Sequence, residues 1–342
     1  MKKTPLTYYL LKLNSKIKNA RIKFIGLWLL HIFNKRYLAV NFDPVNQCNL
    51  RCKMCYFTDE NYVKKLKGVF PPEDLDLWAE RILPQALKLQ VGCGTEPTLY
   101  KHLDKVFALG KKYKVPHISM TTNANLLKEE KLESWIQNGL QEITVSLHGV
   151  KKETYEWLMG RGNYEKFHQS LELITRLKEK YPELVLRINY TFNEDNFKEL
   201  NHFFDVYGQY AIDIIQLRPI SKIGETAYNN FSLEKIIPLY DNFINNFKQK
   251  AKEKNISLLA PASKENLIER ANEQSLIYNF TYVYISPTVF WKDDFDWKNE
   301  TFRQYFKRKK MGKQMLQTAF ASSKKLKAMR REQNLNYQVD LS

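Results

Sequence analysis

Short β-branched runs alternate with longer amphipathic runs from residue 37 onward, and this alternation constrains the fold more than any other feature of the sequence. It is typical of βα units, whose strands lie parallel in one sheet. We predict six strands, at residues 37–42, 87–91, 117–121, 142–147, 185–190 and 212–217. The runs between them predict helices at 72–88, 102–112, 128–138, 165–180 and 196–207. The expected fold is therefore α/β, a partial (β/α)6 TIM-type barrel.

The composition changes after the sixth predicted strand. A long helical pattern at 233–254, a short apolar run at 256–259, a helix at 264–274 and an aromatic, β-like stretch at 278–291 follow it. This region carries no cluster of cysteine, histidine and acidic residues, so we expect an α+β appendage and not a second enzyme. The expected parts are a basic helix at 1–36, the barrel core at 37–225, the appendage at 226–300 and a basic helical tail at 301–342.

The formal net charge of +17 resides at the two ends of the chain. Residues 1–42 hold nine lysines and arginines and no acid, and residues 301–342 hold eleven against two acids. Each end thus carries +9, which leaves −1 for the body of the protein. Two basic ends of this kind suit an anionic partner, and a membrane leaflet is expected before nucleic acid. Basic helix faces that only keep the protein in solution explain the charge equally well.

An apolar run at 24–33 follows the first basic stretch. It is shorter than the ~20 residues that cross a bilayer, and no small-residue cleavage site comes after it. We therefore expect a cytoplasmic protein. The run predicts a helix that either packs on the body or lies in the interface at the inner face of the membrane.

Three of the four cysteines, Cys48, Cys52 and Cys55, follow the first predicted strand with the spacing C-x3-C-x2-C. This spacing is poor for disulfides and indicates a reducing compartment. Three thiolates on one loop can ligate three irons of a cuboidal iron–sulfur cluster and leave the fourth iron open for chemistry. A structural zinc site needs a fourth ligand, which either Cys93 or a distant histidine would have to supply.

The cysteine motif at this place resembles that of the radical S-adenosylmethionine (SAM) superfamily. Other segments at strand ends resemble further elements of the family: residues 94–97 its Gly-Gly-Glu-Pro, residues 121–125 its Thr-Asn-Gly, residues 146–149 its Ser-x-Asp-Gly, and residues 160–164 its Arg-Gly segment. The chain departs from the family pattern at Thr95, which replaces the second glycine, and at His148, which replaces the aspartate. Met54 stands where the family usually has an aromatic residue.

The resemblance implies one [4Fe-4S] cluster on Cys48, Cys52 and Cys55 and a bound SAM. Reduction by a low-potential donor such as flavodoxin or ferredoxin would cleave SAM to a 5′-deoxyadenosyl radical, which abstracts hydrogen, so the chain would be an oxidoreductase or a transferase. By resemblance, Glu96 would hold the amino group of SAM, Arg161 its carboxylate and Ser146 its ribose. The implied cofactor pocket comprises Met54, Gly94, Thr95, Glu96, Pro97, Asn123, Ser146, Arg161 and Asn189.

Residues 280–291 resemble the start of the cysteine-rich SPASM domain of peptide-modifying members of the family. No cysteine follows Cys93, so this SPASM-like region cannot carry an auxiliary cluster. A peptide and a lipid- or sugar-derived envelope precursor are both open as substrates. The alternative from another class is a basic nucleic-acid-binding module without catalysis, with zinc on all four cysteines.

Overall fold

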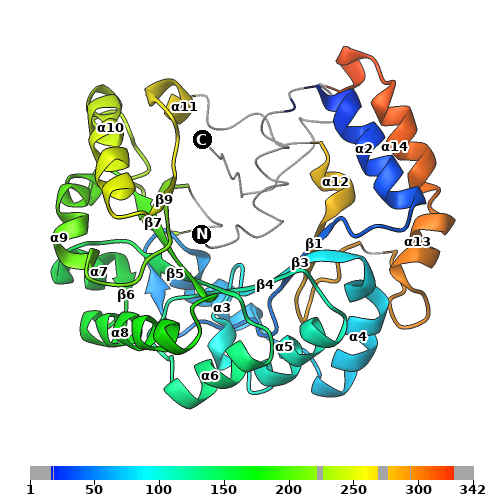
Figure 1. Ribbon diagram of the computed structural model, residues 1–342, viewed down its shortest axis with the longest axis horizontal. Coiled ribbons are helices and arrows are strands. Elements are labelled where there is room, and N and C mark those ends of the chain that lie inside the picture. Colours follow the sequence, from blue (N-terminus) through cyan, green and yellow to red (C-terminus); the bar gives the residue numbers. More distant parts are fainter. Residues whose placement is uncertain (1–16, 18, 222–225, 269–275, 293, 327–342) are drawn as a thin grey trace.

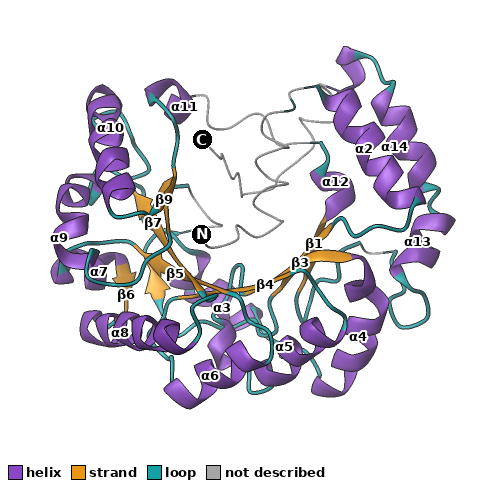
Figure 2. Cartoon of the chain, viewed as in Figure 1, coloured by secondary structure: helices purple, strands orange, loops and turns teal. Residues whose placement is uncertain are grey.

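One curved, entirely parallel sheet organises the molecule (Figure 1). The computed structural model describes residues 17, 19–221, 226–268, 276–292 and 294–326. Its eight-stranded sheet has the order β10-β1-β3-β4-β5-β7-β8-β9. The strands form an open arc with most of the helices on its convex side, as Figure 2 shows. The α/β partial-barrel prediction is therefore confirmed.

The six predicted strands are present with small changes of boundary. They are β1 (Leu38–Phe42), β3 (Ala86–Val91), β4 (His117–Thr122), β5 (Glu142–Leu147), β7 (Val185–Phe192) and β8 (Ile214–Pro219). The region expected to form an appendage adds one strand at each edge: β9 (Ser257–Leu259) pairs with β8, and β10 (Tyr282–Ile285) pairs with β1.

The helices differ more from the prediction. The helix predicted at 72–88 is only α4 (Leu75–Ile82), which lies between the 3-10 turns Pro72–Asp74 and Leu83–Gln85. Pro84 ends it early because proline supplies no backbone N–H to continue the helix. The helix predicted at 196–207 is a 3-10 segment, Phe197–His202, followed by α9 (Phe203–Tyr207). The part of the 264–274 prediction beyond α11 (Lys264–Ile268) lies outside the described residues.

The remaining elements surround the sheet or the first loop. The covering helices are α5 (Leu103–Lys112), α6 (Glu129–Gln137), α8 (Tyr164–Lys180) and α10 (Ile237–Glu253). Shorter elements are β2 (Arg51–Cys52), α3 (Glu60–Lys65), α7 (Lys152–Leu158), β6 (Met159–Gly160) and α12 (Tyr278–Thr281). The N-terminal α2 (Ala20–Ile32) lies beside α14 (Met311–Ala319), with α13 (Phe302–Arg308) at one end of the arc (Figure 1). None of the described helices has both the length and the apolar character that a membrane crossing requires.

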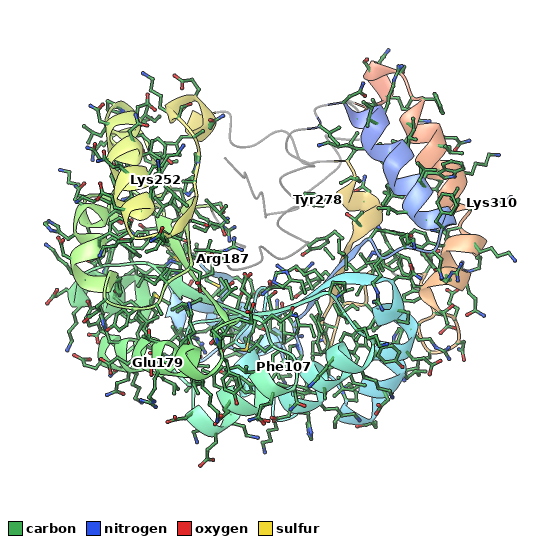
Figure 3. The ribbon with its side chains drawn as sticks, viewed as in Figure 1. Phe107, Glu179, Arg187, Lys252, Tyr278 and Lys310 are labelled. Atoms are coloured by element: carbon green, nitrogen blue, oxygen red, sulfur yellow. The ribbon has the colours of Figure 1, made fainter. Side chains whose placement is uncertain are left out.

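Alternate side chains of the strands point to opposite faces of the sheet, and the two faces differ in chemistry. One row across the strands is apolar and fully buried, as at Val40, Leu89 and Ile143. The row between is polar: Ser119 donates to Gln90 at 2.7 Å. Figure 3 labels Arg187 on the concave side of the arc and Phe107 of α5 on the convex side. The helices thus cover the apolar face, and the concave face is polar.

A buried ionic group lies on the concave side. One carboxylate oxygen of Glu142 lies 3.2 Å from Nε2 of His117, the other accepts from Arg187 at 3.4 Å, and the Glu142 side chain is fully buried. Burial raises the pKa of Glu142, but the hydrogen bond from His117 and the charges of Lys88 and Arg187 outweigh it and hold that pKa well below its usual range. Glu142 therefore stays ionised and neutralises the cations beside it.

A substitution at Gly92, just after β3, tests how tightly the carboxyl ends of the strands are packed. Its φ is +79°, and a Cβ there would lie 2.4 Å from the carbonyl oxygen of Thr121 and 2.7 Å from Cγ of Pro97. We expect Gly92→Ala to lower the free energy of unfolding by about 1–3 kcal/mol, measured by urea denaturation. Gly26→Ala in α2 is the matched control: apart from its chain neighbours and the backbone of its own helix, no atom of the described residues lies within 4 Å of its Cβ position. It should raise that free energy by about 0.5–1 kcal/mol; equal losses in both variants would contradict this account.

Candidate active site

One pocket lies at the carboxyl ends of the strands and collects most of the residues expected there. Ten of the twelve expected site residues line it: Cys48, Cys52, Met54, Cys55, Gly94, Thr95, Glu96, Asn123, Ser146 and Asn189. Parallel α/β barrels place their sites at this rim. The sequence motifs, which are up to 141 residues apart, therefore converge on one place.

The cysteine loop is held in the pocket by short-range bonds. β2, which contains Cys52, pairs antiparallel with β6. A Cβ on Gly160 of β6 would lie 2.7 Å from the carbonyl oxygen of Arg51, so only glycine allows this close pairing. The guanidinium of Arg51 in turn donates to the carbonyl oxygens of Cys48 and Leu50, at 2.9 and 2.8 Å. These bonds fix the direction of the loop.

The three cysteines of the motif are half-buried, in surroundings that disfavour the thiolate. Burial, with the charge of Glu96 second, raises the pKa of Cys48 to about 12. Burial likewise raises the pKa values of Cys52 and Cys55. Thiolates form in such a place when a metal centre supplies the compensating positive charge.

The arrangement of the donors fits a cluster better than a single ion. Among the described residues, no three His, Cys, Asp or Glu side chains are close enough to share one metal ion. Structural zinc requires thiolate sulfurs at about 2.3 Å from the same ion, whereas each cysteine of an iron–sulfur cluster binds a different iron. Cys93 lines the pocket, but its Sγ lies 3.5 Å from Oδ1 of Asn41 and 3.9 Å from the carbonyl oxygen of Gln90. These contacts direct Cys93 toward β1 and β3 and do not favour the four-cysteine zinc site of the alternative prediction.

Glu96 joins the segments around the pocket. One carboxylate oxygen accepts from the backbone and hydroxyl of Thr98 and from the hydroxyl of Thr122, at 3.2, 2.7 and 2.8 Å. The other accepts from the backbone N–H of Asn123 at 2.8 Å. The backbone N–H of Glu96 donates to the carbonyl of Gln47, at 2.9 Å, on the cysteine loop. Glu96 thus positions the pocket wall as well as lining it.

Asn123 reaches from the end of β4 to the cysteine loop. Its side-chain amide donates to Oδ1 of Asn49 at 2.8 Å and lies 4.0 Å from Sγ of Cys48. An N–H directed at a ligating sulfur is one of the means by which proteins set cluster potentials.

Asp43 is a site residue that sequence reasoning missed. It is fully buried just after β1 and accepts from the backbone N–H groups of Cys93 and Gly94, at 2.6 and 3.0 Å. Tyr284 of β10 also donates to it, at 2.8 Å. Asp43 therefore connects the added edge strand to the segment that begins at Gly94. Its position directly after a predicted strand was the available signal.

The far wall of the pocket carries polar atoms without partners. Nδ1 of His148 and Oδ1 of Asn189 are buried and have no hydrogen-bond partner in the described part of the chain. Burial lowers the pKa of His148 to about 4, and the charge of Arg218 contributes in the same direction. The imidazole is therefore neutral near pH 7. Unsatisfied buried groups are costly, so the pocket fits a polar ligand that completes these bonds.

Two expected residues do not line the pocket. Pro97 is buried and begins the 3-10 turn Pro97–Leu99. Arg161 is exposed and has a φ of +69°. Met159, two residues before it, lines the pocket instead. Arg218 at the end of β8 also lines the pocket, and the sequence analysis did not predict it as a site residue.

Comparison with known proteins agrees with this geometry. Residues 43–206 match the radical SAM superfamily. The GTP 3′,8-cyclase of Clostridium botulinum strain Okra is 27% identical over 247 residues, which cover 66% of this chain and 74% of the relative. That of Aquifex aeolicus is 26% identical over 229 residues, which cover 65% and 67%.

Solved structures share the fold. Streptococcus suis SuiB aligns with a TM-score of 0.57 at 18% identity, over 78% of this chain and 62% of SuiB. The structure of anSMEcpe with bound AdoMet and Cp18Cys peptide aligns with a TM-score of 0.56 at 17% identity, over 85% of both chains. The matched segment contains the cysteine loop and most of the pocket. Residues 43–206 therefore form a radical SAM domain, and enzymes with this domain use a [4Fe-4S] cluster and SAM.

Proposed function

We propose that Cys48, Cys52 and Cys55 hold a single [4Fe-4S] cluster and that the adjoining pocket holds SAM. The proposal rests on one observation: these thiols share a pocket with Glu96, Asn123, Ser146 and Asn189, at the carboxyl ends of successive strands. When bound, the cluster supplies one electron to SAM, and the 5′-deoxyadenosyl radical so produced abstracts hydrogen from the substrate.

The protein residues contribute position and exclusion of water. Glu96 and the backbone from Gly94 to Thr95 would bind the methionine end of SAM, because they adjoin the cysteine loop. Ser146 and Asn189, two and three strands further along the sheet than Gly94, would bind its ribose and base. Met54 is buried among Leu158 and other apolar side chains and gives the pocket a soft, apolar wall. A fixed, dry pocket directs the radical to one bond.

We propose a peptide as the substrate class. Arg218 is the only lysine or arginine lining the pocket in the described part of the chain. One guanidinium suits one carboxylate of a peptide, whereas a nucleoside triphosphate such as GTP carries several negative charges to be neutralised. Solved proteins of similar fold hold peptides, SuiB with precursor peptide SuiA among them, and this supports the same choice.

The test of the cofactor chemistry is anaerobic purification of the whole chain. We expect a brown protein with about four irons that forms 5′-deoxyadenosine from SAM when reduced. Alanine at Cys48, Cys52 or Cys55 should abolish both properties, because three ligands leave no spare. Cys93→Ala is the matched control and should keep its iron. Equal iron loss in the Cys93 variant, or colourless wild-type protein with one zinc, would contradict the proposal.

The second test measures SAM affinity by calorimetry. Ser146→Ala should weaken binding by about 0.5–1.5 kcal/mol through loss of one hydrogen bond. Arg161→Ala should leave the dissociation constant within about twofold, because this side chain is exposed and outside the pocket. A loss of roughly 1.5–3 kcal/mol in Arg161→Ala, typical of a charge-assisted bond, would restore the role that its motif implies.

The third test concerns Asn123 and the cluster potential. The side-chain N–H of Asn123 lies near the Cys48 sulfur, where it stabilises the reduced cluster, which is the more negative state. Because Asn123→Ala removes this N–H, the midpoint potential of the cluster should fall by some tens of millivolts. Asn49→Ala is the control, because it removes the other partner of the same amide and leaves the thiol contact. Equal shifts in the two variants would mean that the loop, and not the N–H group, sets the potential.

The substrate class is tested in a deletion strain. Peptides and small molecules are compared by mass spectrometry after complementation with the wild-type chain or with Cys48→Ala. A peptide changed in mass only with the wild-type chain is the expected result. A nucleotide product in its place would contradict the peptide proposal and leave the cofactor assignment intact.

A further inference from the structure

Helix α2 presents an apolar face that the described part of the chain leaves exposed. Six large apolar side chains between residues 22 and 33 are 36–67% exposed. We call this set the α2 apolar face: Ile22, Ile25, Leu29, Leu30, Ile32 and Phe33. These are six of the thirteen exposed large apolar side chains in the described residues. A concentration of this kind on one helix marks an interaction surface.

The other side of α2 is already used for packing. Phe24 and Leu27 are buried, and the ring of Phe24 lies 5.6 Å from that of Phe280. His31 and Trp28 lie against Gly312 of α14. A helix that is apolar all round needs cover on both sides. The neighbouring α14 differs, since its uncovered side carries Lys313, Gln314 and Gln317.

Cations flank the α2 apolar face. At 100° per residue, Arg21 and Lys23 lie on opposite edges of the face. A groove of 870 Å³ adjoins it, with apolar residues such as Ile22 and Leu30 and with Lys23 and Lys35 in its lining. No acid occurs in residues 1–42. An apolar strip between cations is the pattern of a helix that lies in an anionic membrane interface.

We propose that the α2 apolar face docks on an anionic membrane leaflet. A second copy of this chain is the less suitable occupant, because a two-fold contact would bring two strongly basic segments together. The leaflet instead offers acyl chains to the apolar side chains and lipid charges to the flanking cations. This docking is independent of the radical chemistry proposed for the pocket.

The test is cosedimentation of the full-length holoprotein with vesicles. We expect binding to phosphatidylcholine vesicles containing one third phosphatidylglycerol, no binding to phosphatidylcholine alone, and weaker binding at about 1 M salt. Leu29→Glu should reduce the bound fraction about tenfold, because it puts a charge in the apolar face. Leu239→Glu is the matched control: Leu239 is 50% exposed on α10, away from α2, and this variant should bind like the wild type.

Iron content and thermal unfolding confirm that each variant is folded. If Leu29→Glu does not fold, Ile25→Glu on the same face replaces it. Three results would overturn the proposal: wild-type protein that ignores anionic vesicles, a Leu29→Glu variant that binds them unchanged, or a wild-type dimer that Leu29→Glu converts to a monomer. The last would show that a second copy covers the face.

Discussion

The buried carboxylate of Glu96 is the interaction on which the pocket depends. Removing a carboxylate from water is costly, and here four hydrogen bonds from Thr98, Thr122 and Asn123 offset part of that cost. Burial still raises the pKa of Glu96. Those donors belong to the segments that follow β3 and β4, and the backbone of Glu96 extends the link to the cysteine loop. The ends of three strands are thereby fixed relative to one another without any ligand.

Asp43 makes a second connection of the same kind. It joins the end of β1 to the Gly94 segment through two backbone N–H groups and to β10 through Tyr284. Burial raises the pKa of Asp43, and the hydrogen bonds that it accepts act in the opposite direction. The C-terminal strand therefore supports the cofactor pocket although it carries no cysteine of its own.

Local sequence patterns predicted the strands and the cysteine loop. Features that depend on residues far apart in the sequence were missed. Period-2 alternation is written within each strand, and the cysteine spacing lies within one loop. The pairing of β10 with β1 joins residues about 240 positions apart and is not encoded by any local pattern. Arg161 belongs to a motif in the sequence, but its side chain is exposed and does not line the pocket. Arg218 is brought to the pocket by the order of the strands, which sequence spacing alone does not specify.

The groove beside α2 and the cysteine pocket lie at opposite ends of the same sheet. Leu87 and Pro116, near the amino ends of β3 and β4, line the groove, whereas Gly94 and Asn123, beyond their carboxyl ends, line the pocket. A six-residue strand such as β3 is about 20 Å long. A chain lying on a bilayer through α2 would keep the groove beside the lipid and the pocket about one strand length from that groove. Such attachment would fix the orientation of the enzyme, and it would not by itself make a lipid the substrate.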